Sequence, residues 1–104
     1  MFEINGETWC LVLVSPNHPE LVRADGSIAL GVCDNNVKTI YINEELDAQL
    51  TRKVLAHEIT HAAMFSYNVT LTFNQEEMVA ELIETYGQEI IGITNRIINH
   101  MKFS

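Results

Sequence analysis

The segment His57-Glu58-Ile59-Thr60-His61 constrains the fold of this 104-residue chain more than any other feature. In an α-helix, residues four apart lie one above the other on one face, so a helix brings the two imidazoles together with Glu58 beside them. Two histidines placed in this way can share a metal ion, and the glutamate between them can act as a general base. The pattern predicts a helix that carries a metal-dependent hydrolytic site.

The residues around this segment favour a helix over residues 51–66. Thr51 is a suitable N-cap, and Asn68 is a suitable stop beyond the last turn. Apolar residues recur along one flank of the expected helix and predict that it is mostly buried. They are Val54, Leu55, Ile59, Ala62, Ala63 and Phe65.

Residues with strand propensity precede the helix, and a second helix is expected after it. Residues 8–14 form the first expected strand, and residues 27–33 and 37–42 flank a turn as a hairpin. A further helix is expected to begin at Asn74, with an apolar stripe that continues to Ile98. We therefore expect an α+β fold in which about three strands pack on two principal helices in one core.

Composition limits the class of protein. A chain of 104 residues is expected to form a single domain over residues 1–104. The longest apolar run is residues 11–14, and the first residues lack a basic and apolar leader, so we expect a soluble, cytoplasmic protein without a membrane partner. Cys10 and Cys33 are expected to be buried small side chains rather than metal ligands. A net charge of −8 with only six Lys and Arg residues argues against nucleic acid as a partner.

A catalytic zinc ion normally takes three protein ligands, so two histidines need a third partner. The second helix offers Glu77 as that ligand, and Glu81 lies on the same face four residues later. We expect Glu81 to accept a hydrogen bond from the free ring nitrogen of a ligand histidine. The alternative for Glu77 is a helix-capping role, because Asn74-Gln75-Glu76-Glu77 is similar to a capping box. With Zn²⁺ bound, Glu58 would accept a proton from water, and the reaction class would be amide hydrolysis.

Three stretches resemble the zincin metallopeptidases, and among them the minimal ImmA/IrrE-like endopeptidases of bacteria and phages. They are Lys38-Thr39-Ile40-Tyr41-Ile42-Asn43, Ala56-His57-Glu58-Ile59-Thr60-His61-Ala62 and Glu77-Met78-Val79-Ala80-Glu81. The resemblance implies a zinc-dependent endopeptidase with His57, His61 and Glu77 as ligands and Glu58 as catalytic base. Glu76 and Glu81 remain alternatives for the third ligand, because the separation between His61 and Glu77 is short for the family.

The resemblance also implies a protein or peptide substrate, specifically a repressor-type regulatory protein. An exposed arm over residues 37–42 beside the metal would pair with such a substrate by strand addition. The candidates for stabilising the carbonyl oxygen are Tyr67, Tyr86, His18 and His100. Two other functions fit the same residues: a non-catalytic interaction or regulatory protein with a zincin-like fold, and a hydrolase of non-peptide amides.

Overall fold

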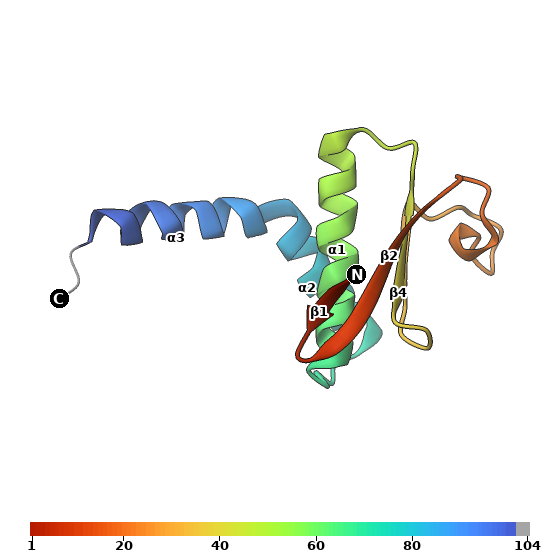
Figure 1. The fold of residues 1–104 in the computed structure, drawn as a ribbon, viewed down its shortest axis with the longest axis horizontal. Coiled ribbons are helices and arrows are strands. Elements are labelled where there is room, and N and C mark those ends of the chain that lie inside the picture. The colour runs from red at the N-terminus through yellow and green to blue at the C-terminus, as the bar shows by residue number, and fades with distance from the viewer. Residues whose placement is uncertain (102–104) are drawn as a thin grey trace.

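The computed structural model describes residues 1–101 and confirms the α+β class. A mixed sheet with the strand order β1-β2-β4-β3 packs against one long helix, α1 (Figure 1). Strands β2 and β4 are parallel, and the other two pairs are antiparallel. The strands are β1 (Phe2–Ile4), β2 (Glu7–Val14), β3 (Gly31–Asp34) and β4 (Thr39–Asn43), and the helices are α1 (Ala48–Ser66), α2 (Phe73–Leu82) and α3 (Gln88–His100). A short 3₁₀ helix, η1 (Pro19–Leu21), precedes β3, and a π-helical turn, η2 (Ile83–Gly87), joins α2 to α3.

The sheet has four strands rather than about three, because the first residues of the chain form β1. Strand β1 pairs with the beginning of β2 through a tight turn at Asn5 and Gly6, both with positive φ. An Asn-Gly pair favours this kind of turn between two strands. The dipeptide was therefore an available signal for the additional strand.

The core lies between the sheet and α1. Trp9, Ile40 and Ile42 of the sheet are fully buried and pack with Val54 and Ala62 of α1. The indole Nε1 of Trp9 donates a hydrogen bond to the Ser66 hydroxyl at 2.8 Å. This bond ties the last turn of α1 to β2.

The hairpin expected before α1 is present, but its second strand, β4, does not lie at the edge of the sheet. Strand β4 lies between β2 and β3, and its Ile40 and Ile42 are fully buried. The expectation that residues 37–42 offer a free edge to a substrate is therefore wrong. The outer edge of this hairpin belongs to β3, which within residues 1–101 pairs with β4 alone.

Helix α1 begins slightly earlier than expected and passes very close to β3. Asp47, rather than Thr51, is the N-cap, and its Oδ1 accepts a hydrogen bond from the Leu50 amide at 2.8 Å. Asn68 adopts φ of 54° just beyond the helix, which confirms its role as the stop. Gly31 of β3 permits the close approach, because a Cβ at that position would lie 2.6 Å from Val54 Cγ1 and 3.1 Å from Glu58 Cγ.

The second helical region does not form one continuous core helix. Helix α2 is capped by Thr72 rather than Asn74, the π-helical turn η2 interrupts the helix, and α3 then projects away from the body (Figure 1). No residue of α3 is buried. The expected apolar stripe is present in α3, but it lies outside the shared core. None of the helices within residues 1–101 is long and apolar enough to span a membrane.

Candidate metal centre

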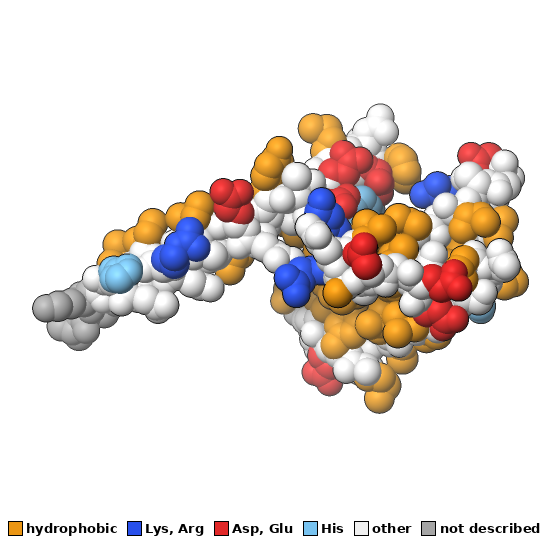
Figure 2. Space-filling model, turned by 90° about the horizontal axis from the view of Figure 1, so that it is seen from above, with side chains coloured by type: hydrophobic (Ala, Val, Ile, Leu, Met, Phe, Trp, Pro, Cys, Tyr) orange, Lys and Arg blue, Asp and Glu red, His pale blue; other side chains and the backbone are white. Residues whose placement is uncertain are grey.

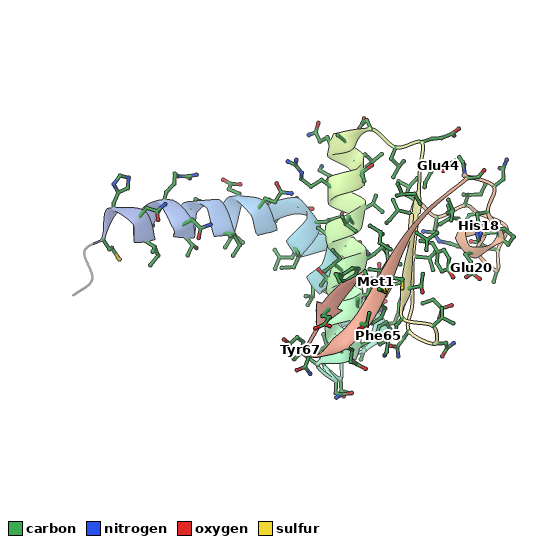
Figure 3. All side chains as sticks on the ribbon, in the orientation of Figure 1. Met1, His18, Glu20, Glu44, Phe65 and Tyr67 are labelled. Carbon is green, nitrogen blue, oxygen red and sulfur yellow. The ribbon has the colours of Figure 1, made fainter. Side chains whose placement is uncertain are left out.

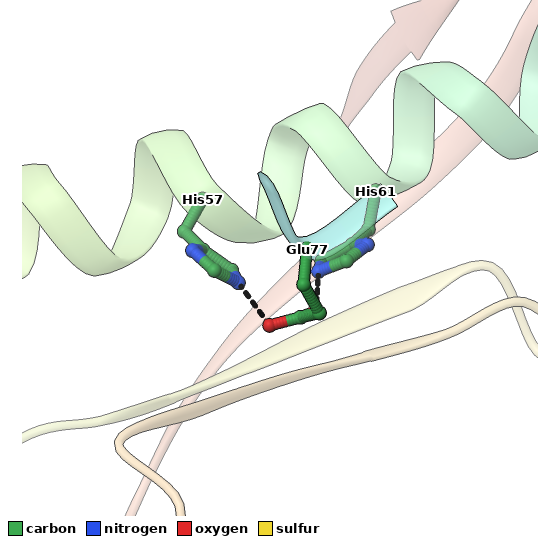
Figure 4. Close-up of side chains that lie close together, drawn as sticks. All are labelled: His57, His61 and Glu77. Carbon is green, nitrogen blue, oxygen red and sulfur yellow. Dashed lines mark ion pairs between the residues drawn. The ribbon is translucent and has the colours of Figure 1, made fainter. Parts of the chain in front are cut away.

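His57 and His61 of α1 and Glu77 of α2 converge on one point (Figure 4). Glu77 Oε1 lies 2.8 Å from His61 Nε2, and Glu77 Oε2 lies 3.6 Å from His57 Nε2. One ligand atom from each residue lies within 4.8 Å of the other two. Neighbouring ligands of a tetrahedral zinc ion, each at roughly 2.0–2.2 Å from the metal, are about 3.4 Å apart. The three side chains therefore have the chemistry and the spacing to hold a metal ion.

The outer nitrogens of both histidines are held by two further glutamates. His57 Nδ1 lies 2.9 Å from Glu84 Oε1, and His61 Nδ1 lies 2.6 Å from Glu76 Oε1. A ring that donates its Nδ1–H to a carboxylate has its Nε2 lone pair free for a metal. The two outer carboxylates therefore favour the tautomer that carries the proton on Nδ1, and both Nε2 atoms face Glu77 in the structure.

Glu81 does not have the role expected from the sequence. Its side chain is exposed, whereas Glu84, in η2, reaches His57. His61 contacts Glu76 in the first turns of α2. His57 lies one turn earlier in α1 and contacts Glu84 in η2. Because these segments run antiparallel, the partner of His57 comes from a later turn than the partner of His61. Glu84 lies seven residues after Glu77 and so on the same helical stripe, which was the available signal.

The alternative capping role of Glu77 is excluded by the observed cap of α2. Thr72 accepts a hydrogen bond from the Gln75 amide at 3.2 Å, and Gln75 Oε1 accepts one from the Thr72 amide at 3.0 Å. This capping box satisfies the first turn without Glu77. The carboxylate of Glu77 is therefore free to face the histidines.

Glu58 lies beside the histidines and is 8% exposed. Burial raises the pKa of its carboxyl above the ordinary value, and the adjacent His57 and His61 partly oppose that effect. The Glu58 side chain also lines the same cleft as both histidines. A carboxylate in this position can exchange a proton with a molecule bound in the cleft.

A cleft of about 460 Å³ opens over these residues. Strand β3 contributes Gly31, Val32 and Cys33 to one wall, and Phe65 of α1 and Phe73 of α2 supply aromatic surface. Burial and the nearby carboxylates of Glu58 and Glu76 raise the pKa of the Cys33 thiol to about 12. Cys33 is therefore a neutral thiol at neutral pH. Both Cys33 and Cys10 are half-buried rather than buried as predicted.

The four candidates for carbonyl stabilisation lie outside the lining of this cleft. His18 stacks on Tyr41, with ring centroids 5.8 Å apart, and lies on the side of the sheet away from α1 (Figure 3). Tyr67 is the exposed C-cap of α1, Tyr86 is exposed in η2, and His100 ends α3. Arg23, which the sequence did not single out, lines the cleft instead.

The family model of Peptidase_M78, described as the IrrE N-terminal-like domain, matches residues 17–98, which is most of the chain. The chain belongs to the IrrE N-terminal-like peptidase family. The matched region contains α1, α2 and all the residues of the candidate centre. No curated protein and no solved structure matches the chain significantly. In this family member, the donor set of two imidazoles and one carboxylate fits a metal ion.

Replacing Glu84 with Ala is expected to weaken metal binding by about 10-fold to 100-fold, because His57 loses the carboxylate that fixes its tautomer. The affinity for Zn²⁺ is measured by competition with a chromophoric chelator. Glu81→Ala is the matched control, because it removes an exposed glutamate from the same helical region. Equal affinities for the two variants would contradict the assigned role of Glu84.

Proposed function

We propose that this member of the family is a zinc-dependent endopeptidase. The observation that carries the proposal is the convergence of Glu77 on the Nε2 atoms of both motif histidines. Two neutral imidazoles and one carboxylate are a ligand set found in catalytic zinc sites, where a fourth position is left to water or substrate. The family match supports a peptidase in general, and this ligand set supports zinc in particular.

His57, His61 and Glu77 would hold the ion, with Glu84 and Glu76 orienting the two rings. When bound, zinc supplies positive charge that acidifies water and polarises the carbonyl of the scissile bond. Glu58 accepts a proton from the attacking water and then donates it to the departing amine. Its buried position beside the histidines keeps the carboxylate close to the reacting groups.

The substrate would bind as an extended strand along β3. The Asn43 amide donates a hydrogen bond to the Leu30 carbonyl, so residues 30 and 43 form a hydrogen-bonded pair. Such pairs alternate along an antiparallel ladder, and the backbone groups of Gly31 and Cys33 therefore point away from β4. Both residues line the cleft. Strand addition at this edge would place a peptide bond across the metal centre.

The substrate class that we propose is a regulatory protein of the repressor type in a bacterial or phage cytoplasm. Support for this class comes from the family resemblance, and the open cleft beside a free strand edge suits a polypeptide better than a compact small molecule. Both cysteines are free thiols, which suits a reducing compartment. With a net charge of −8, the protein is poorly suited to binding nucleic acid directly.

Glu58→Gln distinguishes the peptidase from a non-catalytic binding protein with the same fold. The variant is expected to retain Zn²⁺ and to cleave a peptide library about 100-fold to 10,000-fold more slowly, because the general base is lost. His61→Ala serves as the comparison, since it is expected to lose both zinc and cleavage. Cleavage products are measured by mass spectrometry. Wild-type protein that binds zinc without cleaving any peptide, or unchanged cleavage by Glu58→Gln, would contradict the proposal.

Cys33→Pro tests the binding of substrate along β3. Proline removes the Cys33 amide from the free edge without removing a hydrogen bond to β4, and KM for a cleaved peptide is expected to rise about tenfold. Cys33→Ala is the matched control for loss of the thiol. Zinc affinity and unfolding are measured in parallel to show that both variants are folded. Identical KM values for the two variants would exclude strand addition at this position.

A further inference from the structure

Helix α3 projects from the body of the protein (Figure 1), and within residues 1–101 no other element covers its isoleucines. It continues directly from η2, and all of its isoleucines are exposed by 41% or more. Isolated helices of about 12–15 residues are only marginally stable in water, and most helical stability in proteins comes from packing an apolar face. Helix α3 continues directly from α2 through η2, so only its beginning is supported by the body, and its exposed apolar face would be stabilised by packing on a further surface.

The apolar side chains lie along one edge of α3 (Figure 2). Ile90, Ile93 and Ile97 are separated by three and then four residues, which is the spacing of a coiled-coil seam. The opposite face carries polar residues such as Asn95. The pattern therefore fits another helix lying along α3.

Two charged residues flank this seam at positions that are complementary under a two-fold axis. Glu89 precedes Ile90, and Arg96 precedes Ile97, so the two charges lie seven residues apart on the same side of the seam. In an antiparallel pair of identical helices, the side of one helix that carries Glu89 and Arg96 faces the side of the other helix that carries the same two residues. When Ile90 packs against Ile93 of a second copy, Glu89 lies opposite Arg96 of that copy, and the reverse pair forms as well.

We propose that α3 is an antiparallel dimerisation helix whose occupant is a second copy of this chain. At the centre of the helix pair, Ile90 of each copy packs against Ile93 of the other copy. Glu89 of each copy pairs with Arg96 of the other, and these two pairs set the orientation and register of the helices. Ile97 then reaches the η2 segment of the second copy. The two bodies lie at opposite ends of the paired helices, so both clefts remain accessible. The interface does not depend on the proposed peptidase activity.

The charge of the protein favours a second copy over a membrane surface. Helices that lie on membranes have basic residues along their polar face, whereas α3 carries Arg96 and Glu89, with His100 at its end. One Glu and one Arg on the same side of the seam instead suit a contact between two identical helices.

Charge reversal tests both the dimer and its register. The wild-type chain is expected to sediment with twice the monomer mass of 11.8 kDa, with dissociation in the micromolar range. Glu89→Arg and Arg96→Glu each place like charges opposite one another, and each is expected to raise the dimer Kd about tenfold. The double variant, and an equimolar mixture of the two single variants, are expected to recover the wild-type Kd because opposite charges again face one another.

The seam is tested with a matched pair of substitutions. Ile93→Asp places a charge in the central layer and is expected to abolish the dimer, whereas Asn95→Asp adds the same charge on the opposite face and is expected to leave it intact. Circular dichroism shows whether each variant is folded. A wild-type chain that stays monomeric throughout a sub-millimolar series would overturn the proposal. So would a dimer that is insensitive to Ile93→Asp or charge reversal, or cosedimentation of the monomer with phosphatidylglycerol vesicles.

Discussion

The contact of Glu77 with His57 and His61 is the interaction on which the functional arrangement depends, because it joins two helices that are otherwise separated by a turn. Three buried or half-buried ionisable groups at one point are unfavourable unless they are paired or bind a cation. Glu76 and Glu84 extend the pairing to the outer nitrogens of the rings. The group therefore forms a preorganised centre with an excess of negative charge, which favours a divalent cation.

The sheet packs against α1 beside this centre. Gly31 lets β3 approach α1 closely, and the hydrogen bond between Trp9 and Ser66 holds the end of the helix against β2. Glu58 consequently lies between the histidines and a free strand edge. The same packing that builds the core therefore also places a carboxylate, the candidate metal ligands and the outer edge of β3 around one cleft.

The motif residues were predictable because helical periodicity alone puts His57 and His61 on one face. The need for a third ligand pointed to the second helix, where Glu77 was preferred and Glu76 and Glu81 remained alternatives. The capping box at Thr72 leaves the Glu77 carboxylate available. Other features depend on tertiary contacts. The choice of Glu84 over Glu81 depends on how α2 and η2 cross α1, and the buried position of β4 depends on its parallel pairing with β2. Gly87, the last residue of the π-helical turn, is a poor helix former and so was a sequence signal for the interruption. The projection of α3 has no clear signature in the sequence.

X-ray absorption at the zinc edge of the reconstituted protein identifies the atoms that bind the ion. The spectrum is expected to show two imidazole nitrogens and carboxylate oxygen at about 2.0–2.2 Å, with one ion per chain. Glu77→Ala is expected to remove the carboxylate contribution and leave both imidazoles. A sulfur ligand at about 2.3 Å, fewer than two imidazoles, or an unchanged spectrum in Glu77→Ala would contradict the account.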